Sequence, residues 1–348
     1  MRAIEHRDGQ RLAFLDGWRG VAILLVLVGH FLSDTIRPGL SVLGVDLFFV
    51  LSGRLMAEIL FVRRVPLKTF FVRRFSRVYP ALLVFVVAAT ALFYGTSLGH
   101  GVGAVATALT FTTNYAMIYS HPIAVLDHLW SLCVEEHGYL LLAVIATAVV
   151  RDQRSATIVL LALGFAAMAN GIVRAMMLNI WFPETAWRTD VQIAPLFLAG
   201  GFYLAARRLE VLQRSWISPT CLVLGLAVKL CSDQVFVQFG LGTVLLALAV
   251  ATIDFATVGF RSLFEPKILC QIGLWSFSLY LWQQPFYKMA HTDLLPAGLA
   301  LLAALCVGVT SFYLVEVPMR LTINERWQAF LHKRSQLKDV NAAGINPI

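Results

Sequence analysis

The chain has 348 residues, of which 59% are hydrophobic and 14% are charged, and its formal net charge is +8. Soluble domains average about 45–50% apolar and about 25% charged residues, so this composition excludes a soluble enzyme and a disordered chain. The apolar residues form recurring blocks separated by short charged clusters, which is the layout of a polytopic helical membrane protein. We therefore expect an all-α fold, a polytopic bundle of membrane helices.

Ten apolar blocks are long enough to cross a bilayer. An eleventh apolar stretch, 103–119, carries four threonines and an asparagine, so we interpret it as interfacial or re-entrant. An even number of spans places both ends of the chain on the same side. The ten expected spans are residues 18–35, 42–62, 78–97, 137–151, 155–173, 191–206, 216–230, 234–252, 268–290 and 294–316.

The basic residues predict the orientation, because Lys and Arg concentrate in cytoplasmic loops. With the N-terminus inside, 21 of the 28 Lys and Arg residues fall on the inner side and 4 on the outer side. We therefore expect both termini to be cytoplasmic (N-in/C-in), and the first helix to be uncleaved because no cleavage pattern follows it. The expected domain organisation is one transmembrane domain, 11–320, and a cytoplasmic tail, 321–348, that is amphipathic and then disordered.

Two ionisable side chains lie on one face of the first expected span. Arg19 and His30 are eleven positions apart, which returns to the same side of a helix roughly 16 Å further along it. Asp34 follows His30 at i+4, and Asp46 and Gln283 lie at a similar depth in their own spans. A carboxylate bonded to one imidazole nitrogen would leave the other free as a general base. Asp34 and Asp46 are the two candidates for this carboxylate, and a hydrogen-bonded packing histidine is the alternative for His30.

Arginines cluster in the inner loop that follows the second span. Arg73, Arg74 and Arg77 have a spacing at which guanidinium groups can converge on one side of a helix and bind phosphate. The alternative is simple anchoring of the loop at the cytoplasmic surface. Arg19, near the same surface, is either a functional residue or an arginine that extends to the surface from a helix end.

The long outer segment after the third span lacks Lys and Arg but contains histidines and carboxylates. His128, Ser131 and Glu135 share one face of any helix that begins there. Their spacing matches no zinc motif, so we expect no metal site, and a capped helix start is the alternative interpretation. Arg188 and Asp190, before the sixth span, form either a surface pair or part of an outward-facing acceptor site.

Several short motifs follow one another along the chain. They are Leu15-Asp16-Gly17-Trp18-Arg19-Gly20, the Arg19-to-His30 spacing, Asp46-Leu47-Phe48-Phe49-Val50-Leu51-Ser52-Gly53, Arg73-Arg74-Phe75-Ser76-Arg77-Val78-Tyr79-Pro80, His128-Leu129-Trp130-Ser131-Leu132-Cys133-Val134-Glu135-Glu136, Ser278-Leu279-Tyr280-Leu281-Trp282 and Glu316-Val317-Pro318. Each motif is weak alone, but together and in this order, over residues 11–320, they resemble the acyltransferase 3 family of integral membrane acyltransferases.

The resemblance implies transfer of an acyl group, most often acetyl, from cytoplasmic coenzyme A to a hydroxyl of a surface glycan or lipid-linked sugar. By position, His30 looks like the essential catalytic histidine, and Arg19, Arg73, Arg74 and Arg77 look like the donor-side basic residues. Asp34 and Asp46 complete the expected catalytic group. Residues expected on the supporting or acceptor side are Ser131, Glu135, His128, Arg188, Asp190 and Gln283.

The resemblance also implies the partners and the location. Acyl-CoA is expected as a co-substrate, with no bound cofactor, and the other partners are a glycan or lipid-linked saccharide and membrane lipids, with no nucleic acid. The chain is expected in a bacterial inner membrane, in the stand-alone form without the esterase-like domain that some relatives carry. One position departs from the family pattern, because Gln283 stands where many relatives have a histidine. Glutamine cannot shuttle a proton, so we expect His30 to act alone.

The sequence leaves two questions open. Within the enzyme interpretation, His30 either deprotonates the acceptor hydroxyl or takes the acyl group itself. A transporter or flippase for a glycan or lipid precursor is the alternative from another class, because it would use the same intramembrane polar cluster as a pathway.

Overall fold

The computed structural model describes residues 12–32, 39–119, 125–149, 152–180, 184–232 and 234–342. Within these ranges every regular element is a helix, as the composition predicts. The helices are α1 Ala13–Phe31, α2 Leu40–Ala57, α3 Leu67–Leu92, α4 Val102–Leu109, α5 Thr113–Tyr119, α6 Leu129–Val144, α7 Gln153–Met177, α8 Thr189–Gln192, α9 Ala194–Ala206, α10 Ile217–Cys231, α11 Val235–Val237, α12 Thr243–Ala251, α13 Val258–Ser262, α14 Lys267–His291, α15 Ala297–Ser311 and α16 Val317–Ala342. Short π-helical segments (π turns) span Glu58–Val62, Ile145–Val149, Gln238–Gly242 and Phe312–Glu316. Short 3-10 helical segments (3-10 turns) span Glu210–Gln213 and Ile253–Phe255.

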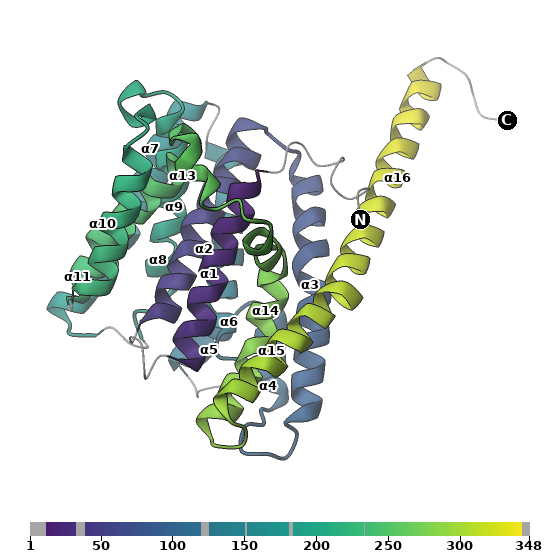
Figure 1. Ribbon diagram of the computed structural model, residues 1–348. Helices are drawn as coiled ribbons and strands as arrows, with labels where there is room; N and C mark the ends of the chain where they lie inside the picture. Colours follow the sequence, from purple (N-terminus) through teal and green to yellow (C-terminus); the bar gives the residue numbers. More distant parts are fainter. Residues whose placement is uncertain are drawn as a thin grey trace.

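The helix α1 lies at the centre of the bundle, packed between α2 and α14 (Figure 1). On the α2 side, α9 and α12 pack against α2, α7 packs against α9, and α10 packs against α12. On the other side, α15 packs against α14, and α16 packs against α3. In Figure 1 the far part of α16, in yellow, projects beyond the rest of the bundle.

The sequence of α1 explains its central position. Phe14, Trp18, Ala22 and Val26 are each one turn apart, and all four are buried. This spacing places them on one face of the helix. The indole Nε1 of Trp18 donates a hydrogen bond to the carbonyl oxygen of Leu47 at 3.1 Å, so the largest side chain on this face carries no unpaired donor into the core.

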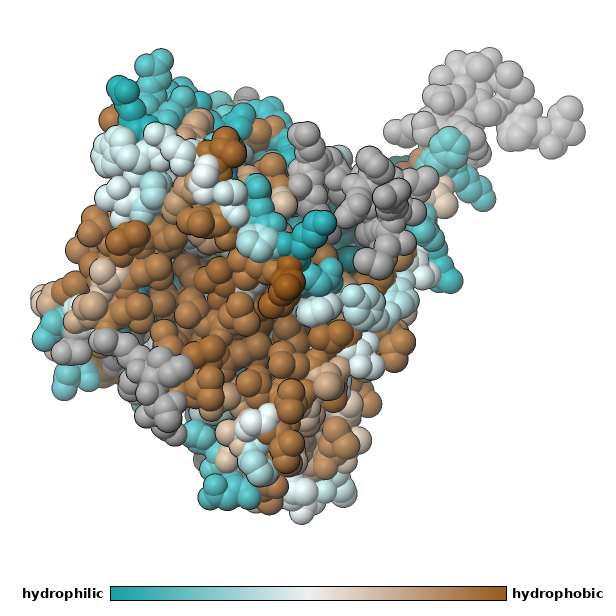
Figure 2. All heavy atoms as spheres, viewed as in Figure 1, coloured by the Kyte–Doolittle hydropathy of each residue, from teal (hydrophilic) through white to brown (hydrophobic). Residues whose placement is uncertain are grey.

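Five helices among the described residues are long and apolar enough to cross a membrane, and two further apolar helices, Ile217–Cys231 and Val235–Ala251, are shorter. Figure 2 shows hydrophobic residues over the middle of the molecule and hydrophilic residues at its upper and lower edges. These features identify an integral membrane protein. The ten spans and the N-in/C-in orientation stay predictions. The five long helices are Ala13–Phe31, Leu67–Leu92, Leu129–Thr147, Gln153–Met177 and Ala297–Arg334.

Several boundaries differ from the sequence-based expectation. The stretch 103–119 forms two short helices, α4 and α5, interrupted where Phe111 has φ +55°. The arginine cluster lies on a helix and not in a loop, because α3 begins at Leu67. The expected tail continues α15 through a π turn as one helical rod to Ala342, and residues 343–348 lie outside the described ranges.

Glycines allow the central helices to touch through their backbones. A Cβ built on Gly273 of α14 would lie 1.8 Å from the carbonyl oxygen of Asp16 on α1. A Cβ on Gly53 of α2 would lie 1.9 Å from the carbonyl oxygen of Leu196 on α9. No side chain can occupy such a gap, so these two glycines determine how closely their helices pack.

We predict that Gly273→Ala destabilises the protein by about 1–3 kcal/mol, because the added methyl group must push α14 away from the α1 backbone. The unfolding midpoint in detergent, monitored by size-exclusion chromatography after heating, measures the effect. Gly298→Ala is the matched control, because Gly298 lies near the start of α15 with nothing within 4 Å of its built Cβ. Equal unfolding midpoints for the two variants would contradict the close packing of α1 and α14.

Candidate active site

His30 lies in the last turn of α1, and its ring is held in two ways. Its Nδ1 lies 2.7 Å from Oε1 of Gln283 on α14. Its ring stacks on Tyr287, with 4.5 Å between the ring centroids. In the part of the chain that the structure describes, Gln283 is its hydrogen-bond partner, which leaves Nε2 available for chemistry. An imidazole with one nitrogen held and the other available can act as a general base or a nucleophile.

Gln283 is fully buried and is held in turn by further polar contacts. Its Nε2 donates to Oε1 of Gln284 at 3.1 Å, and Nε2 of Gln284 donates to Oδ1 of Asp127 in the turn before α6. Oδ2 of Asp127 pairs with Nζ of Lys288 at 2.6 Å. The sequence places Gln283 at the depth of His30, but it offers Asp127 only as a possible helix cap and indicates no role for Gln284 or Lys288. The two adjacent glutamines inside an apolar span were the one feature of the sequence that could have indicated this polar network.

The two aspartates expected beside His30 have different outcomes. Asp34 lies outside the described residues, so its role stays a prediction. Asp46 is buried on α2, where Oδ2 pairs with Nζ of Lys229 on α10 at 2.6 Å. Lys229 also donates to Oγ1 of Thr243 at 3.3 Å. The contact to Nδ1 of His30 therefore comes from Gln283 on α14, while Asp46 is engaged by α10.

The structure separates the arginines that the sequence groups together, and Arg74 lies against two carboxylates. Its Nε lies 2.6 Å from Oε1 of Glu136, and its Nη2 lies 3.3 Å from Oε2 of Glu135. Its guanidinium group also covers the ring of Tyr139, 4.3 Å from the centroid. Glu135 accepts a further hydrogen bond from Oγ of Ser52 at 2.6 Å, so this cluster joins α2, α3 and α6. The charge of Arg74 is thus paired within the protein, and its role as a donor-side residue stays a prediction.

Glu316, in the π turn before α16, is the buried carboxylate around which the other arginines gather. Oγ of Ser278 donates to its Oε2 at 2.8 Å, and Nη1 of Arg320 lies 3.7 Å from its Oε1. The charges of Arg77 and Arg19 also act on it. Arg320 has Glu316 as a counter-charge and Arg19 has Asp16, at 3.2 Å.

Arg77 differs from these neighbours in its bonding. It is half-buried on α3, and no described residue forms a hydrogen bond or ion pair with it. A half-buried guanidinium group without a bonded counter-charge is a suitable ligand for a phosphate group. Arg73 lies exposed on the same helix. Of the expected donor-side arginines, Arg77 therefore has the strongest geometric support.

Ser131 and His128 connect the start of α6 to α14. Oγ of Ser131 lies 2.6 Å from the hydroxyl of Tyr280, and this hydroxyl donates to the carbonyl oxygen of His128 at 2.6 Å. The buried His128 ring packs against Phe85 and Tyr280, and neither ring nitrogen has a hydrogen-bond partner among the described residues. These contacts hold the turn that carries Asp127 against α14.

Arg188 and Asp190 form an ion pair, as one of the two interpretations expects. Nε and Nη2 of Arg188 lie 2.9 Å and 3.1 Å from the two oxygens of Asp190, and Nη1 donates to the hydroxyl of Tyr119 at 3.0 Å. Partial burial alone would raise the pKa of Asp190, but Arg188 and a hydrogen bond from Asn170 outweigh it and hold this pKa below its usual value. Arg188 also borders an open pocket of about 550 Å³. The pocket is lined by Ile118, Tyr119, Arg174, Asn179, Ile180, Glu184 and Arg188.

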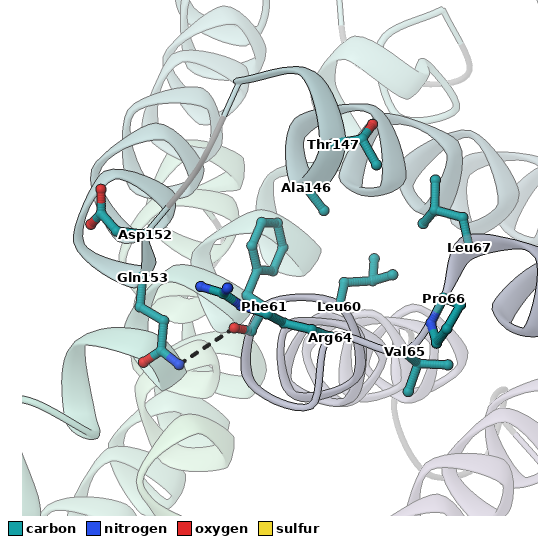
Figure 3. A pocket seen from close by; sticks show the side chains of 10 residues that line it. All are labelled: Leu60, Phe61, Arg64, Val65, Pro66, Leu67, Ala146, Thr147, Asp152 and Gln153. Carbon is teal, nitrogen blue, oxygen red and sulfur yellow. Dashed lines mark hydrogen bonds between the residues drawn. The ribbon is translucent and has the colours of Figure 1, made fainter.

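A second pocket, of about 420 Å³, lies between the end of α2, the start of α3, the end of α6 and the start of α7 (Figure 3). Leu60 and Phe61 form part of its wall, and Gln153 donates to the carbonyl oxygen of Phe61 at 3.4 Å. Ser41 lies beside Gly29, next to His30. Leu60 is 19 residues further along the same helical run, which is about 28 Å at roughly 1.5 Å per residue. This pocket is therefore remote from His30.

The described residues place no group of three or more His, Cys, Asp or Glu side chains where they could hold a metal ion. The polar centre instead consists of hydrogen-bonded pairs and ion pairs between helices.

Comparison with known proteins gives a consistent result. A family model described as an acyltransferase domain matches residues 12–317. The chain is 26% identical to the peptidoglycan O-acetyltransferase OatA of Listeria monocytogenes over 351 residues, covering 88% of this chain and 55% of that protein. It is also 26% identical to the O-acetyltransferase OatA of Staphylococcus aureus over 349 residues, covering 88% of this chain and 57% of that protein. The chain thus spans a little over half the length of these relatives. No solved structure matches it.

We predict that Arg74→Gln destabilises the protein by about 3–5 kcal/mol, because it leaves Glu135 and Glu136 close together without their counter-charge. Thermal unfolding in detergent measures this loss. Arg73→Gln removes the same charge from the exposed neighbouring position and should shift the midpoint much less. An Arg74→Gln protein with an unchanged midpoint and only a weakened affinity for acyl-CoA would show that Arg74 binds the donor instead.

Proposed function

The chain belongs to the acyltransferase 3 family, and from this premise we propose that it is a membrane-bound O-acyltransferase. It transfers an acyl group, with acetyl as the expected group, from cytoplasmic acyl-CoA to a hydroxyl of a surface glycan or lipid-linked sugar. The proposal rests on the geometry of His30, because Gln283 holds its Nδ1 and leaves its Nε2 available to accept a proton or an acyl group. The names of the two relatives, both O-acetyltransferases, support acetyl transfer.

We place the phosphates of coenzyme A at the arginine cluster beside Glu316. Arg19, Arg77 and Arg320 come from three helices and act on this one buried carboxylate, and Arg77 has no bonded partner among the described residues. Arg73 is exposed nearby and adds to the positive charge. Arg19 and His30 lie eleven residues apart on one helix face, about 16 Å along α1. An extended pantetheine arm would cover this distance and carry the thioester toward His30.

The proposed chemistry has two forms, which the sequence also left open. In the direct form, Nε2 of His30 takes the proton of the acceptor hydroxyl, whose oxygen attacks the thioester carbonyl carbon. The C–S bond then breaks, the ester forms, and the proton passes from the imidazolium to the departing thiolate. In the covalent form, Nε2 attacks the thioester carbonyl carbon first and the C–S bond breaks, which releases the thiolate. The acceptor hydroxyl then attacks the acyl group on Nε2, the N–C bond breaks as the ester forms, and the hydroxyl proton goes to the thiolate. Both forms use no bound cofactor and need Nε2 unprotonated at the start.

We assign the acceptor to the side of the protein that carries Arg188 and Asp190. The pocket beside this pair combines the exposed ring of Tyr119 with planar polar groups on Arg174, Asn179 and Glu184. An aromatic ring and planar hydrogen-bonding side chains suit a polar saccharide with a ring to stack on. We place the protein in a bacterial inner membrane, in contact with membrane lipids, because the proposed donor is cytoplasmic and the proposed acceptor lies outside.

The first experiment measures release of free coenzyme A by the protein in nanodiscs, supplied with acetyl-CoA and a panel of lipid-linked and polymeric glycans. His30→Ala should lower acceptor-dependent release by about 100-fold or more, because a general base contributes about 10²–10⁴-fold. His332→Ala, which removes an exposed histidine from α16, is the control. Equal release by wild type and His30→Ala would remove His30 from the chemistry. Folded protein that transports a glycan precursor without consuming any acyl-CoA would instead support a transporter.

A second prediction concerns the donor site. Arg77→Gln should raise the KM for acetyl-CoA about tenfold or more and change kcat much less, because one charge-assisted contact to a phosphate is lost. Lys68→Gln, which removes an exposed cation from the first turn of α3, should leave this KM within about twofold of the wild-type value. Steady-state kinetics at low ionic strength measures both values. An unchanged KM for Arg77→Gln would move the phosphate site away from α3.

A further inference from the structure

A continuous series of hydrogen bonds connects His30 to a charged pair at the end of α14. From His30 it passes through Gln283 and Gln284 to Asp127, whose other oxygen pairs with Lys288. Both glutamines are buried, with 0% and 3% of their surface exposed, so their amide groups have little access to water as alternative partners. Each amide must therefore be oriented by its neighbours in the series.

The charged end determines the direction of every bond in this series. An ionised carboxylate only accepts hydrogen bonds, so Gln284 must present its NH₂ group to Asp127. The oxygen of Gln284 then faces Gln283, which must present its own NH₂ group. The oxygen of Gln283 is left facing Nδ1 of His30 and can only accept, so Nδ1 must carry the proton. A neutral imidazole has one proton, so Nε2 keeps its lone pair.

We propose that Asp127, acting through Gln284 and Gln283, is a positioning residue that selects the tautomer of His30 in which Nε2 can act as a base. This inference rests on the proposed function and adds to it the group that prepares His30 for the reaction. It also assigns a role to Gln283 that needs no proton transfer by the amide. A carboxylate orients the imidazole, as expected for a general base, but it acts from a distance through two amides.

Direct contact with the ammonium group of Lys288 favours the charged form of Asp127 against the effect of burial. Burial raises the pKa of Asp127 above its usual value, and Lys288, the backbone N–H of His128 and the amide of Gln284 limit this rise by stabilising the carboxylate. The other titratable groups near this series are His30 on α1, the His128 ring before α6, and Tyr287 and His291 on α14. Lys288 is the cation in direct contact with Asp127, at 2.6 Å.

Asp127→Asn tests the proposal because it should reverse the donor-to-acceptor direction of every hydrogen bond between residue 127 and His30. The new amide has one oxygen, which faces Lys288, since an ammonium group only donates. Its NH₂ group then faces Gln284, so both glutamines must turn over and Gln283 presents NH₂ to His30. Nδ1 must now accept, and the proton moves to Nε2. We expect kcat to fall about tenfold or more, with the KM for acetyl-CoA within about twofold of the wild-type value.

The tautomer can be measured without turnover, by nitrogen NMR of protein in nanodiscs with ¹⁵N-labelled histidine. Loss of a signal in His30→Ala identifies His30. Wild type should show a protonated Nδ1, and Asp127→Asn should show a protonated Nε2. Asp293→Asn is the matched control, because Asp293 is exposed just beyond α14 and outside the series. It should match wild type in both the spectrum and kcat.

A second variant separates orientation from stability. Adding Gln283→Glu to Asp127→Asn restores the net charge and places an acceptor-only group against both Gln284 and Nδ1, so the protonated Nδ1 and most of kcat should return. The proposal is overturned if Asp127→Asn keeps the wild-type spectrum, or if the double variant unfolds at the wild-type temperature yet keeps a protonated Nε2. If no acceptor supports turnover, the proposed function fails, while the spectra still decide the tautomer.

Discussion

The polar centre of this protein is governed by one constraint, which is that a charge buried among membrane helices needs a counter-charge close to it. Water is not available to it there, and an unpaired ion costs several kcal/mol. Three clusters meet this constraint in the same way. Asp46 pairs with Lys229 across α2 and α10, and Arg54 pairs with Asp254 at 2.5 Å. Arg74 joins α3 to the carboxylates of α6. Each cluster therefore also brings together segments that lie far apart in the sequence.

The same constraint distinguishes structural arginines from those available to a ligand. Arg74 has two carboxylates and an aromatic ring as partners, so its charge is used within the protein. Arg77, one turn away on α3, has no bonded partner among the described residues. A phosphate group arriving there would supply the missing anion. Binding of the donor would then also give the half-buried cation its counter-charge. Such a cation, already in place before the ligand binds, is a preorganised part of a site.

The sequence predicted the class of fold and the helix that carries His30, because hydropathy and helical periodicity are local properties. It also placed Gln283 at the right depth. It could not identify Gln283 as the partner of His30, because the two residues are 253 positions apart and only tertiary packing brings them together. Nor could it separate Arg73, Arg74 and Arg77. Adjacent positions on a helix point about 100° apart, and which of them meets α6 depends on how α3 is rotated in the bundle.

The backbone contacts made by glycine also limit how the bundle can move. His30 and Gln283 lie on α1 and α14, and Gly273 sits directly against the Asp16 carbonyl at the junction of these two helices. A slide of one turn along the axis, about 5.4 Å, would bring the side chain of Leu269 or Phe277 toward that carbonyl. This close contact therefore opposes sliding of α14 along α1. A rocking cycle that opened the protein alternately to each side would then keep α1 and α14 in one moving part, and the imidazole would stay in contact with the amide that holds it.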